Sequence, residues 1–308
     1  MHRDQKIFTM NIEFCMKQIL IVDDSETSIL YLKMILRDYN VVSALNGTEM
    51  WERLRESIPS LILMDVMLPD VNGYELVKQL SNNILYKDIP IIFQTAKSSS
   101  DDLEKGFESG AIDYVRKPVD KKELRARIKS VLKIKDLENE LYLKSITDYL
   151  TGIYNRRYFF EIASKTLEMS KLDNNNFCIA LIDIDFFKKI NDEYGHDAGD
   201  YVLKQFSEIV KQSIRQNDIF ARYGGEEFIL LFPNSEKQNA LEILEKIQFI
   251  VRKQILHFNE EKITFTFSSG LSISNEITPD PSLDPIIKIA DERLYKAKHS
   301  GRDQIIIT

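Results

Sequence analysis

The sequence predicts an α/β protein with two domains: a doubly wound parallel sheet, then an α+β domain, with a helix joining them. Its length of 308 residues suits two domains of ordinary size. Five short apolar runs alternate with amphipathic stretches in residues 17–133, which is typical of a parallel sheet covered by helices. From Phe177 onward the strand and helix patterns follow the order β-α-β-β-α-β, which is typical of an antiparallel sheet with helices on one face.

The composition is that of an ordinary globular protein, with 44% hydrophobic and 29% charged residues. The net charge of -7 and the pI near 5.4 argue against a general nucleic-acid-binding surface. No apolar run reaches the roughly 18 residues of a membrane span, and the N-terminus lacks the apolar core of a signal peptide. Cys15, Cys178 and the histidines show no metal-ligand spacing. We therefore expect a cytoplasmic protein with no membrane or nucleic-acid partner.

Residues 17–133 are expected to form the first domain, after an N-terminal extension at residues 1–16. Short runs rich in Ile, Val and Leu are the strand candidates: Gln18–Val22, Val41–Ala44, Leu61–Met64, Ile89–Phe93 and Ala111–Val115. Amphipathic stretches are the helix candidates: Ser25–Arg37, Thr48–Glu56, Gly73–Leu80, Ser99–Ser109 and the stretch from Lys121 onward. A sheet of this kind binds ligands beyond the carboxyl ends of its strands.

Polar residues follow the strands at that edge. The first strand runs into Asp23 and Asp24, and the third runs into Asp65. Thr95 follows the fourth strand, and Lys117 follows the fifth. One of the first two aspartates could merely cap the next helix, but that would leave the other residues unexplained. Because packed carboxylates repel one another, we expect a divalent cation among them and an aspartate that can accept a phosphoryl group.

Four segments at these strand ends match one known family: Ile-Val-Asp-Asp-Ser, Leu-Met-Asp-Val-Met-Leu-Pro-Asp-Val-Asn-Gly, Gln-Thr-Ala and Tyr-Val-Arg-Lys-Pro. On these segments, residues 17 to about 133 resemble the flavodoxin-like receiver domain of two-component response regulators. The resemblance implies that Asp65 accepts a phosphoryl group from a histidine kinase or phosphotransfer protein.

The same resemblance implies roles for the neighbouring residues. Mg²⁺ would be held by Asp24, Asp65 and the Met67 carbonyl, with help from Asp23. Lys117 would pair with the phosphate. The pair that reports phosphorylation would be Thr95 and Tyr114. The residue before that threonine, Gln94, is less usual for the family.

The last helix of the first domain is expected to continue, because Lys121 to Thr147 contains neither Gly nor Pro. Its apolar residues stand at gaps of 4, 3, 3, 3 and 4: Leu124, Ile128, Val131, Ile134, Leu137 and Leu141. This spacing is helical but is not a sustained heptad. The helix could pack on its own domain. Alternatively, residues 134–147 form a helical linker that pairs with its copy in a homodimer, which the family resemblance favours.

The second domain is expected at residues 148–308. The strand candidates are Phe177–Ile182, Ile219–Tyr223, Phe228–Phe232, Ile263–Ile273 and Gln304–Ile307. The helix candidates are Arg156–Met169, Asp200–Ile214, Glu236–Leu256 and Pro285–Lys298. In a ferredoxin-like topology the central strands are adjacent. The segment after Ile182 should therefore lie beside the hairpin that carries Arg-Tyr-Gly-Gly-Glu-Glu-Phe.

The Gly-Gly-Glu-Glu stretch of that hairpin has two interpretations. It could be an ordinary tight turn, in which glycine supplies a positive φ and the carboxylates are solvated. It could instead be a metal-bound phosphate site, with Gly224 and Gly225 open to a phosphate and Glu226 and Glu227 holding Mg²⁺. The nearby Asp183 favours the second interpretation and indicates phosphoryl or nucleotidyl transfer.

Five segments of this half, in order, match a second family. They are Asp148-Tyr-Leu-Thr-Gly-Ile-Tyr-Asn-Arg-Arg157, Asp183-Ile-Asp-Phe-Phe-Lys-Lys-Ile-Asn-Asp192, Gly195-His-Asp-Ala-Gly-Asp200, Arg222-Tyr-Gly-Gly-Glu-Glu-Phe228 and Lys298-His-Ser-Gly-Arg302. Residues 148–308 thus resemble a GGDEF domain, the diguanylate cyclase module, which has an α+β ferredoxin-like (palm-like) fold. The resemblance implies that two GTP molecules are condensed into cyclic di-GMP. Small departures from the family pattern are Ile153, Arg293 and Asp303.

The resemblance also implies roles for single residues. Mg²⁺ would be held by Asp183, the Ile184 carbonyl, Glu226 and Glu227. Glu226 and Lys188 would be the catalytic residues. The substrate contacts would be Phe186, Phe187, Lys188, Asn191, His196, Asp200, Lys298 and Arg302. Of these, Asn191 and Asp200 complement the donor and acceptor edge of guanine, and the two phenylalanines could equally belong to the core.

Two further expectations concern assembly and control. Each domain binds one GTP, so the family's reaction requires two domains to face each other in a homodimer. Arg215-Gln-Asn-Asp218 is either a surface turn or the family's product-inhibition site, where Arg215 and Asp218 bind cyclic di-GMP. The alternative to an enzyme is an inactive response regulator that binds GTP or cyclic di-GMP. The complete set of acids and guanine contacts favours the enzyme.

Overall fold

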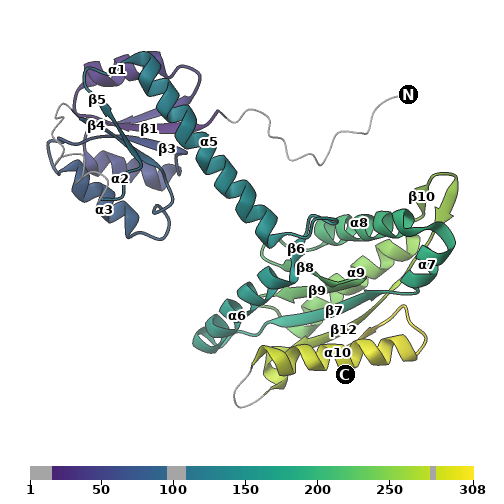
Figure 1. The fold of residues 1–308 in the computed structure, drawn as a ribbon. Helices are drawn as coiled ribbons and strands as arrows, with labels where there is room; N and C mark the ends of the chain where they lie inside the picture. The colour runs from purple at the N-terminus through teal and green to yellow at the C-terminus, as the bar shows by residue number, and fades with distance from the viewer. Residues whose placement is uncertain (1–15, 96–108, 278–281) are drawn as a thin grey trace. The chain divides into compact units, whose positions relative to one another are not determined.

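The computed structural model describes residues 16–95, 109–277 and 282–308 (Figure 1). The chain forms two compact units with their boundary between Glu140 and Leu141, inside the predicted linker. We call them the N-terminal unit and the C-terminal unit. Within the described ranges, no helix combines the length and the apolar character needed to cross a bilayer.

The N-terminal unit is built on a five-stranded parallel sheet in the order β2-β1-β3-β4-β5. Its strands are β1 (Gln18–Val22), β2 (Asn40–Ala44), β3 (Leu61–Asp65), β4 (Ile91–Thr95) and β5 (Asp113–Arg116). Its helices are α1 (Glu26–Ile35), α2 (Gly47–Glu56), α3 (Gly73–Ser81) and α5 (Lys121–Ile146). The prediction of a doubly wound parallel sheet is confirmed. The helix predicted at Ser99–Ser109 lies outside the described residues except for its last residue.

Side chains that alternate along the strands divide this core into two layers. Leu63 and Ile92 pack in one cluster with residues of α1 and α5, whereas Met64 and Phe93 pack in another with residues of α2 and α3. The Ser25 side chain caps α1 by accepting a hydrogen bond from the Ser28 N–H. Helix capping is therefore not the role of the preceding aspartates.

The helix α5 is continuous across the boundary between the units. Leu124 and Ile128 are fully buried in the core of the N-terminal unit. Further along, Ile134, Leu137 and Leu141 expose 55%, 48% and 67% of their surfaces. The first half of α5 thus packs on its own unit, and its second half presents apolar side chains to solvent.

The C-terminal unit contains a six-stranded mixed sheet in the order β13-β12-β7-β9-β8-β6. Its strands are β6 (Tyr154–Asn155), β7 (Cys178–Ile184), β8 (Ile219–Gly224), β9 (Glu227–Phe232), β12 (Phe267–Ile273) and β13 (Ile305–Ile306), and a separate hairpin is formed by β10 (Leu256–Phe258) and β11 (Glu261–Ile263). Its helices are α6 (Arg156–Asp173), α7 (Phe187–Tyr194), α8 (His196–Ser213), α9 (Lys237–Lys253), α10 (Leu283–His299) and a 3₁₀ turn, η1 (Ser274–Glu276).

The two helices of the predicted β-α-β-β-α-β unit, α8 and α9, pack on one face of this sheet as expected, and two further helices cover the other face (Figure 1). Phe206 of α8 and Ile247 of α9 pack on one face, and Phe159 of α6 and Leu294 of α10 pack on the other. The two helices that flank the β-α-β-β-α-β core, α6 and α10, supply the second layer. Their presence makes β7 a central strand that is buried along its whole length.

One local prediction was wrong, and one helix was missed. The single strand predicted at Ile263–Ile273 is interrupted between β11 and β12, although apolar and polar residues alternate through the gap. The helix α7, which directly follows the Asp183 segment, was not predicted. It is short, and its amphipathic pattern covers only two turns, so the sequence signal was weak.

Candidate functional sites

The N-terminal unit gathers three carboxylates at the carboxyl edge of its sheet. Asp23 and Asp24 follow β1, and Asp65 ends the adjacent β3. One oxygen of each carboxylate lies within 4.8 Å of an oxygen of both others. Asp23 and Asp65 are buried, and Asp24 is exposed. This donor set fits a divalent cation, because hard oxygen ligands suit Mg²⁺ and close carboxylates need a neutralising charge.

Lys117 supplies positive charge to this carboxylate cluster. Its Nζ donates hydrogen bonds to Asp23 Oδ2 at 2.7 Å and to Asp65 Oδ2 at 2.6 Å. Burial lowers the pKa of Lys117, but the hydrogen bonds to the two carboxylates outweigh burial and hold the pKa above its ordinary value. The structure thus brings together four residues that the sequence predicted for one pocket.

The other residues predicted for this pocket lie in the neighbouring strands β4 and β5 or just after β3. Thr95 ends β4 and is buried, and Tyr114 lies in the adjacent β5. The Met67 backbone N–H donates a hydrogen bond to Asp65 Oδ1 at 3.2 Å. Their roles in metal binding and switching stay predictions.

The C-terminal unit places a second acidic group at one end of its sheet. Asp183, near the end of β7, lies opposite Glu227 of β9 and Ser268 of β12. The Ile184 backbone N–H donates a hydrogen bond to the Glu226 carbonyl at 3.4 Å. The predicted adjacency of this strand end to the glycine hairpin is therefore confirmed.

The surroundings of Asp183 in this second site disfavour its ionised form. Burial raises its pKa to about 6, the Lys298 ammonium at 2.7 Å offsets part of that shift, and Glu226 and Glu227 add to it. In the described ranges, these three acids do not form a group as tight as the one in the N-terminal unit. A buried acid with one lysine and two neighbouring glutamates fits a divalent cation, which would neutralise the surplus negative charge.

The hairpin itself has an open tip. Gly225 has a φ of +54°, and no described atom lies within 4 Å of a Cβ built on Gly224 or Gly225. The turn is also anchored from behind, because Arg222 Nε donates to the Gly225 carbonyl at 2.9 Å and its Nη1 donates to Asp148 Oδ1 at 3.1 Å. Arg222 and Asp148 therefore join two of the quoted motifs, and sequence reasoning assigned neither of them a role.

The two adjacent phenylalanines after this strand have different environments. Phe187 is buried in the core, as the packing alternative expected, whereas Phe186 exposes 60% of its surface and has a φ of +56°. Asn191 lies against α8, since a Cβ on Gly199 would come within 1.9 Å of its Oδ1. A glycine at position 199 therefore leaves space for the predicted guanine contact.

The remaining predicted contacts lie at the surface or beside Phe186. Lys188, His196 and Asp200 are exposed. The Arg302 guanidinium lies 4.4 Å from the centre of the Phe186 ring. This places Arg302 next to the strand end that carries Asp183.

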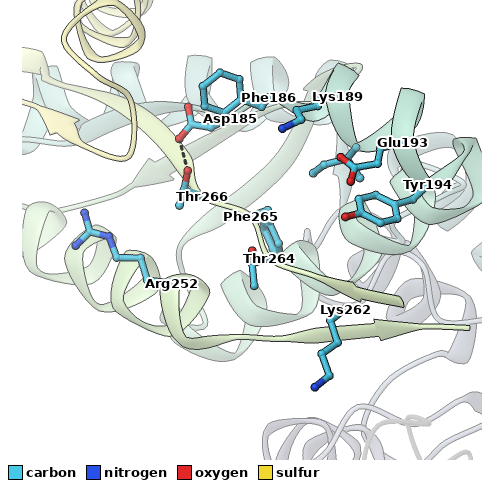
Figure 2. A pocket seen from close by; sticks show the side chains of 11 residues that line it. Asp185, Phe186, Lys189, Glu193, Tyr194, Arg252, Lys262, Thr264, Phe265 and Thr266 are labelled. Carbon is cyan, nitrogen blue, oxygen red and sulfur yellow. Dashed lines mark hydrogen bonds between the residues drawn. The ribbon is translucent and has the colours of Figure 1, made fainter. Parts of the chain in front are cut away.

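Beyond Phe186, a pocket of about 630 Å³ lies between one side of α7 and the segment that joins β11 to β12 (Figure 2). Asp185 lies at its wall and is held by hydrogen bonds from Thr266 Oγ1 at 2.8 Å, Ser268 Oγ at 2.7 Å and the Asp303 N–H at 3.0 Å. Asp185 was not predicted as a site residue, yet it fixes the loop after Asp183. Of the predicted substrate contacts among the described residues, Phe186 lines this pocket and the guanine contacts do not.

The predicted product-inhibition residues form a closed turn. The Arg215 N–H donates a hydrogen bond to Asp218 Oδ2 at 2.8 Å, and the Arg215 side chain is exposed. Burial raises the pKa of Asp218 above its ordinary value, although this hydrogen bond and the nearby arginine oppose the rise. The geometry is compatible with a surface turn and with an inhibition site, so the regulatory role stays a prediction.

Comparison with known proteins identifies both units. Residues 145–304 match the family described as "Diguanylate cyclase, GGDEF domain", and residues 19–129 match the "Response regulator receiver domain". Response regulator PleD of Caulobacter vibrioides is 32% identical over 257 residues, which is 80% of this chain and 56% of PleD. Diguanylate cyclase A of Treponema denticola is 35% identical over 190 residues, which is 61% of this chain and 51% of that protein.

A solved structure extends the comparison to the fold. The crystal structure of the coiled coil and GGDEF domain of DgcB from Caulobacter crescentus, in complex with c-di-GMP, has a TM-score of 0.56 and 26% sequence identity. The match covers 60% of this chain and 97% of that chain. This chain spans a little over half the length of the two curated relatives described above, 56% and 51%. The chain belongs to the GGDEF diguanylate cyclase family and carries a response regulator receiver domain before its GGDEF domain.

Proposed function

We propose that the chain is a phosphorylation-regulated diguanylate cyclase that condenses two GTP molecules into cyclic di-GMP and releases two pyrophosphates. The observation that carries this proposal is the buried Asp183 beside the open Gly224-Gly225 turn, with its pKa raised to about 6 and a lysine at its carboxylate. A buried carboxylate with a raised pKa is typical of a site that binds a cation and an anionic substrate, and less typical of a structural ion pair.

In the proposed reaction, the 3′-hydroxyl of each GTP attacks the α-phosphate of the other. Glu226 accepts the proton of the hydroxyl, and Lys188, Lys298 and Arg302 stabilise the charge that develops on the phosphates. Asn191 and Asp200 bind guanine, with His196 near that pocket. The exposed Phe186 and the buried Phe187 shape the loop that approaches the substrate.

Both acidic clusters have the oxygen donors that Mg²⁺ prefers. In the C-terminal unit we assign the ion to Asp183, the Ile184 carbonyl, Glu226 and Glu227. In the N-terminal unit we assign it to Asp23, Asp24, Asp65 and the Met67 carbonyl. When bound, Mg²⁺ neutralises the phosphates and polarises the phosphorus that is attacked.

Because each domain holds one GTP, the proposed enzyme works as a homodimer. The apolar side chains exposed on the second half of α5, Ile134, Leu137 and Leu141, support a helix that pairs with its copy. A histidine kinase or phosphotransfer protein phosphorylates Asp65, and Thr95 and Tyr114 change conformation in response. This change alters how often two GTP-loaded domains meet. Product bound at Arg215 and Asp218 inhibits the enzyme.

The test is to incubate the purified chain with GTP and Mg²⁺, with and without beryllofluoride as a phosphoryl mimic, and to quantify cyclic di-GMP. We expect synthesis that rises with the mimic. Glu226→Gln should abolish synthesis without unfolding the chain, and Asp65→Asn should abolish only the response to the mimic.

Undiminished synthesis by Glu226→Gln would contradict the site assignment. An absence of product from the wild type, after bound nucleotide has been stripped away, would favour the alternative of an inactive GTP- or cyclic di-GMP-binding regulator. A mimic response that persists in Asp65→Asn would retain the cyclase and remove the phosphorylation switch.

A further inference from the structure

One buried side chain beside the proposed phosphoacceptor pocket has no hydrogen-bond partner among the described residues. Gln94, in β4, has 0% of its surface exposed. Neither its Nε2 nor its Oε1 makes a hydrogen bond with any described residue. A buried carboxamide without partners destabilises a fold by roughly 1–3 kcal/mol, and an apolar side chain of the same shape would avoid that cost. A state of the protein that supplies a partner would remove that cost.

The strand register locates Gln94 next to the proposed phosphoacceptor. Gln94 is paired with Asp65 of β3 on one side and with Val115 of β5 on the other. Leu63 and Ile92, each two residues earlier in their strands, pack in the same cluster with α1 and α5. Because side chains in a strand alternate with a period of two, Gln94 and Asp65 lie on the same face of the sheet.

Lys117 approaches from the same direction. It follows β5, and its Nζ reaches Asp65 of β3 at 2.6 Å, so its side chain passes over the end of β4, which lies between these two strands. Thr95, the next residue of β4, points to the opposite face by the same alternation. Gln94 is therefore a second polar group of β4 at this pocket, on the Lys117 side.

We propose that Gln94 is a further phosphoryl-binding residue, whose carboxamide donates a hydrogen bond to the phosphoryl group carried by Asp65. This inference rests on the proposed role of Asp65 as the phosphoacceptor. A phosphoryl group adds three strong acceptor oxygens and close to two negative charges, and a glutamine carboxamide offers two N–H donors. Phosphorylation thus supplies a partner that none of the described residues provides. The hydrogen bond from Gln94 therefore stabilises the phosphorylated state relative to the unphosphorylated one.

The test measures binding of beryllofluoride, in the presence of Mg²⁺, to the full chain by fluorine NMR or calorimetric titration. Gln94→Met keeps the length of the side chain and removes its donors. We expect Gln94→Met to weaken binding about tenfold, the loss expected for one hydrogen bond to a charged group. We also expect its melting temperature without the mimic to rise, because an unpaired buried polar group has been removed.

The chain offers a matched control. Gln248, in α9 of the C-terminal unit, is buried, and its Nε2 likewise lacks a partner among the described residues. Gln248→Met should leave beryllofluoride binding unchanged, which excludes a general effect of replacing glutamine by methionine.

Two results would overturn the inference, and they are distinguishable. Equal affinities of the wild type and Gln94→Met, with binding abolished in Asp65→Asn, would remove Gln94 from the site and leave the phosphoacceptor intact. Binding that persists in Asp65→Asn would remove the phosphoacceptor assignment itself, and the role of Gln94 with it.

Discussion

Opposite ends of the β7–β12 pair in the C-terminal unit hold two acids with opposite electrostatic environments. At one end, Asp183 has a single lysine partner, and burial together with neighbouring glutamates raises its pKa to about 6. At the other end, Glu276 follows β12 and accepts hydrogen bonds from Arg293 at 2.8 and 2.9 Å, from Lys237 and from the Ile273 N–H. Burial opposes these bonds, but they lower its pKa to about 2.

The difference separates a structural acid, Glu276, from Asp183, the acid proposed to function in catalysis. Glu276 is neutralised within the fold, so its charge contributes to stability. Asp183 remains short of positive charge, which costs stability and leaves room for a cation and phosphates. Arg293, which departs from the family pattern, lies at the Glu276 end of the sheet. Its guanidinium donates hydrogen bonds to Glu276 and to the Leu271 carbonyl, so its role there is structural.

The largest expected effect is on activity at the Asp183 end. Asp183→Asn should lower the rate of cyclic di-GMP synthesis at least about a hundredfold, as expected when a group that stabilises the transition state is lost. The metal-free variant should be more stable than the wild type at pH 7, by up to about 3 kcal/mol, because the amide removes a buried charge whose pKa is raised. Denaturant unfolding and product quantification check both parts. If Asp183→Asn is inactive because it is unfolded, the claim that the charge of Asp183 costs stability is wrong.

A smaller and opposite effect is expected at the other end. Glu276→Gln should lower the free energy of unfolding of the C-terminal unit by about 2 kcal/mol, because it leaves Arg293 and Lys237 without their carboxylate. The rate of synthesis per folded molecule should not change, because Glu276 lies at the end of the sheet away from the proposed substrate site. A large loss of rate in folded Glu276→Gln would show that the two ends are coupled.

The pH dependence of stability should give the smallest effect. The pKa of Glu276 is lowered from 4.5 to about 2, so its contribution is complete above pH 4.5 and is lost as the pH falls toward 2. The difference in unfolding free energy between the wild type and Glu276→Gln should therefore be constant from pH 7 to 5 and narrow by about 1 kcal/mol by pH 3. Urea unfolding at several pH values measures it. If this difference in unfolding free energy widens as the pH falls, the ionised form of Glu276 does not stabilise the fold.

The sequence predicted the strands and helices best where the local pattern was long. The five parallel strands and α8, α9 and α10 follow from the spacing of apolar residues, a pattern that acts within a few positions of the chain. The helix α7 and the break before β12 were missed, because two turns of helix and a three-residue gap leave almost no periodic signal. The second helical layer of the C-terminal unit was missed because a β-α-β-β-α-β order does not say where the flanking helices pack.

The candidate sites divide in the same way. Adjacency of Asp183 to the glycine hairpin, and of Asp65 to Lys117, followed from strand order, since the ends of neighbouring strands meet at one edge. The packing of Phe187, the exposure of Phe186 and the anchoring of the hairpin by Arg222 and Asp148 did not follow from it. They depend on which side chains from distant segments share one space.

The sequence by itself determined the family motifs, the order of the elements and the residue types available at each site, because these are local properties of the chain. Only the tertiary structure decided the charge balance. Lys298 pairs with Asp183, Arg293 pairs with Glu276, and Gln94 lies beside Asp65 with no hydrogen-bond partner in the described parts of the chain. Burial and Coulomb interactions depend on distance in space, and folding sets those distances between residues far apart in the chain.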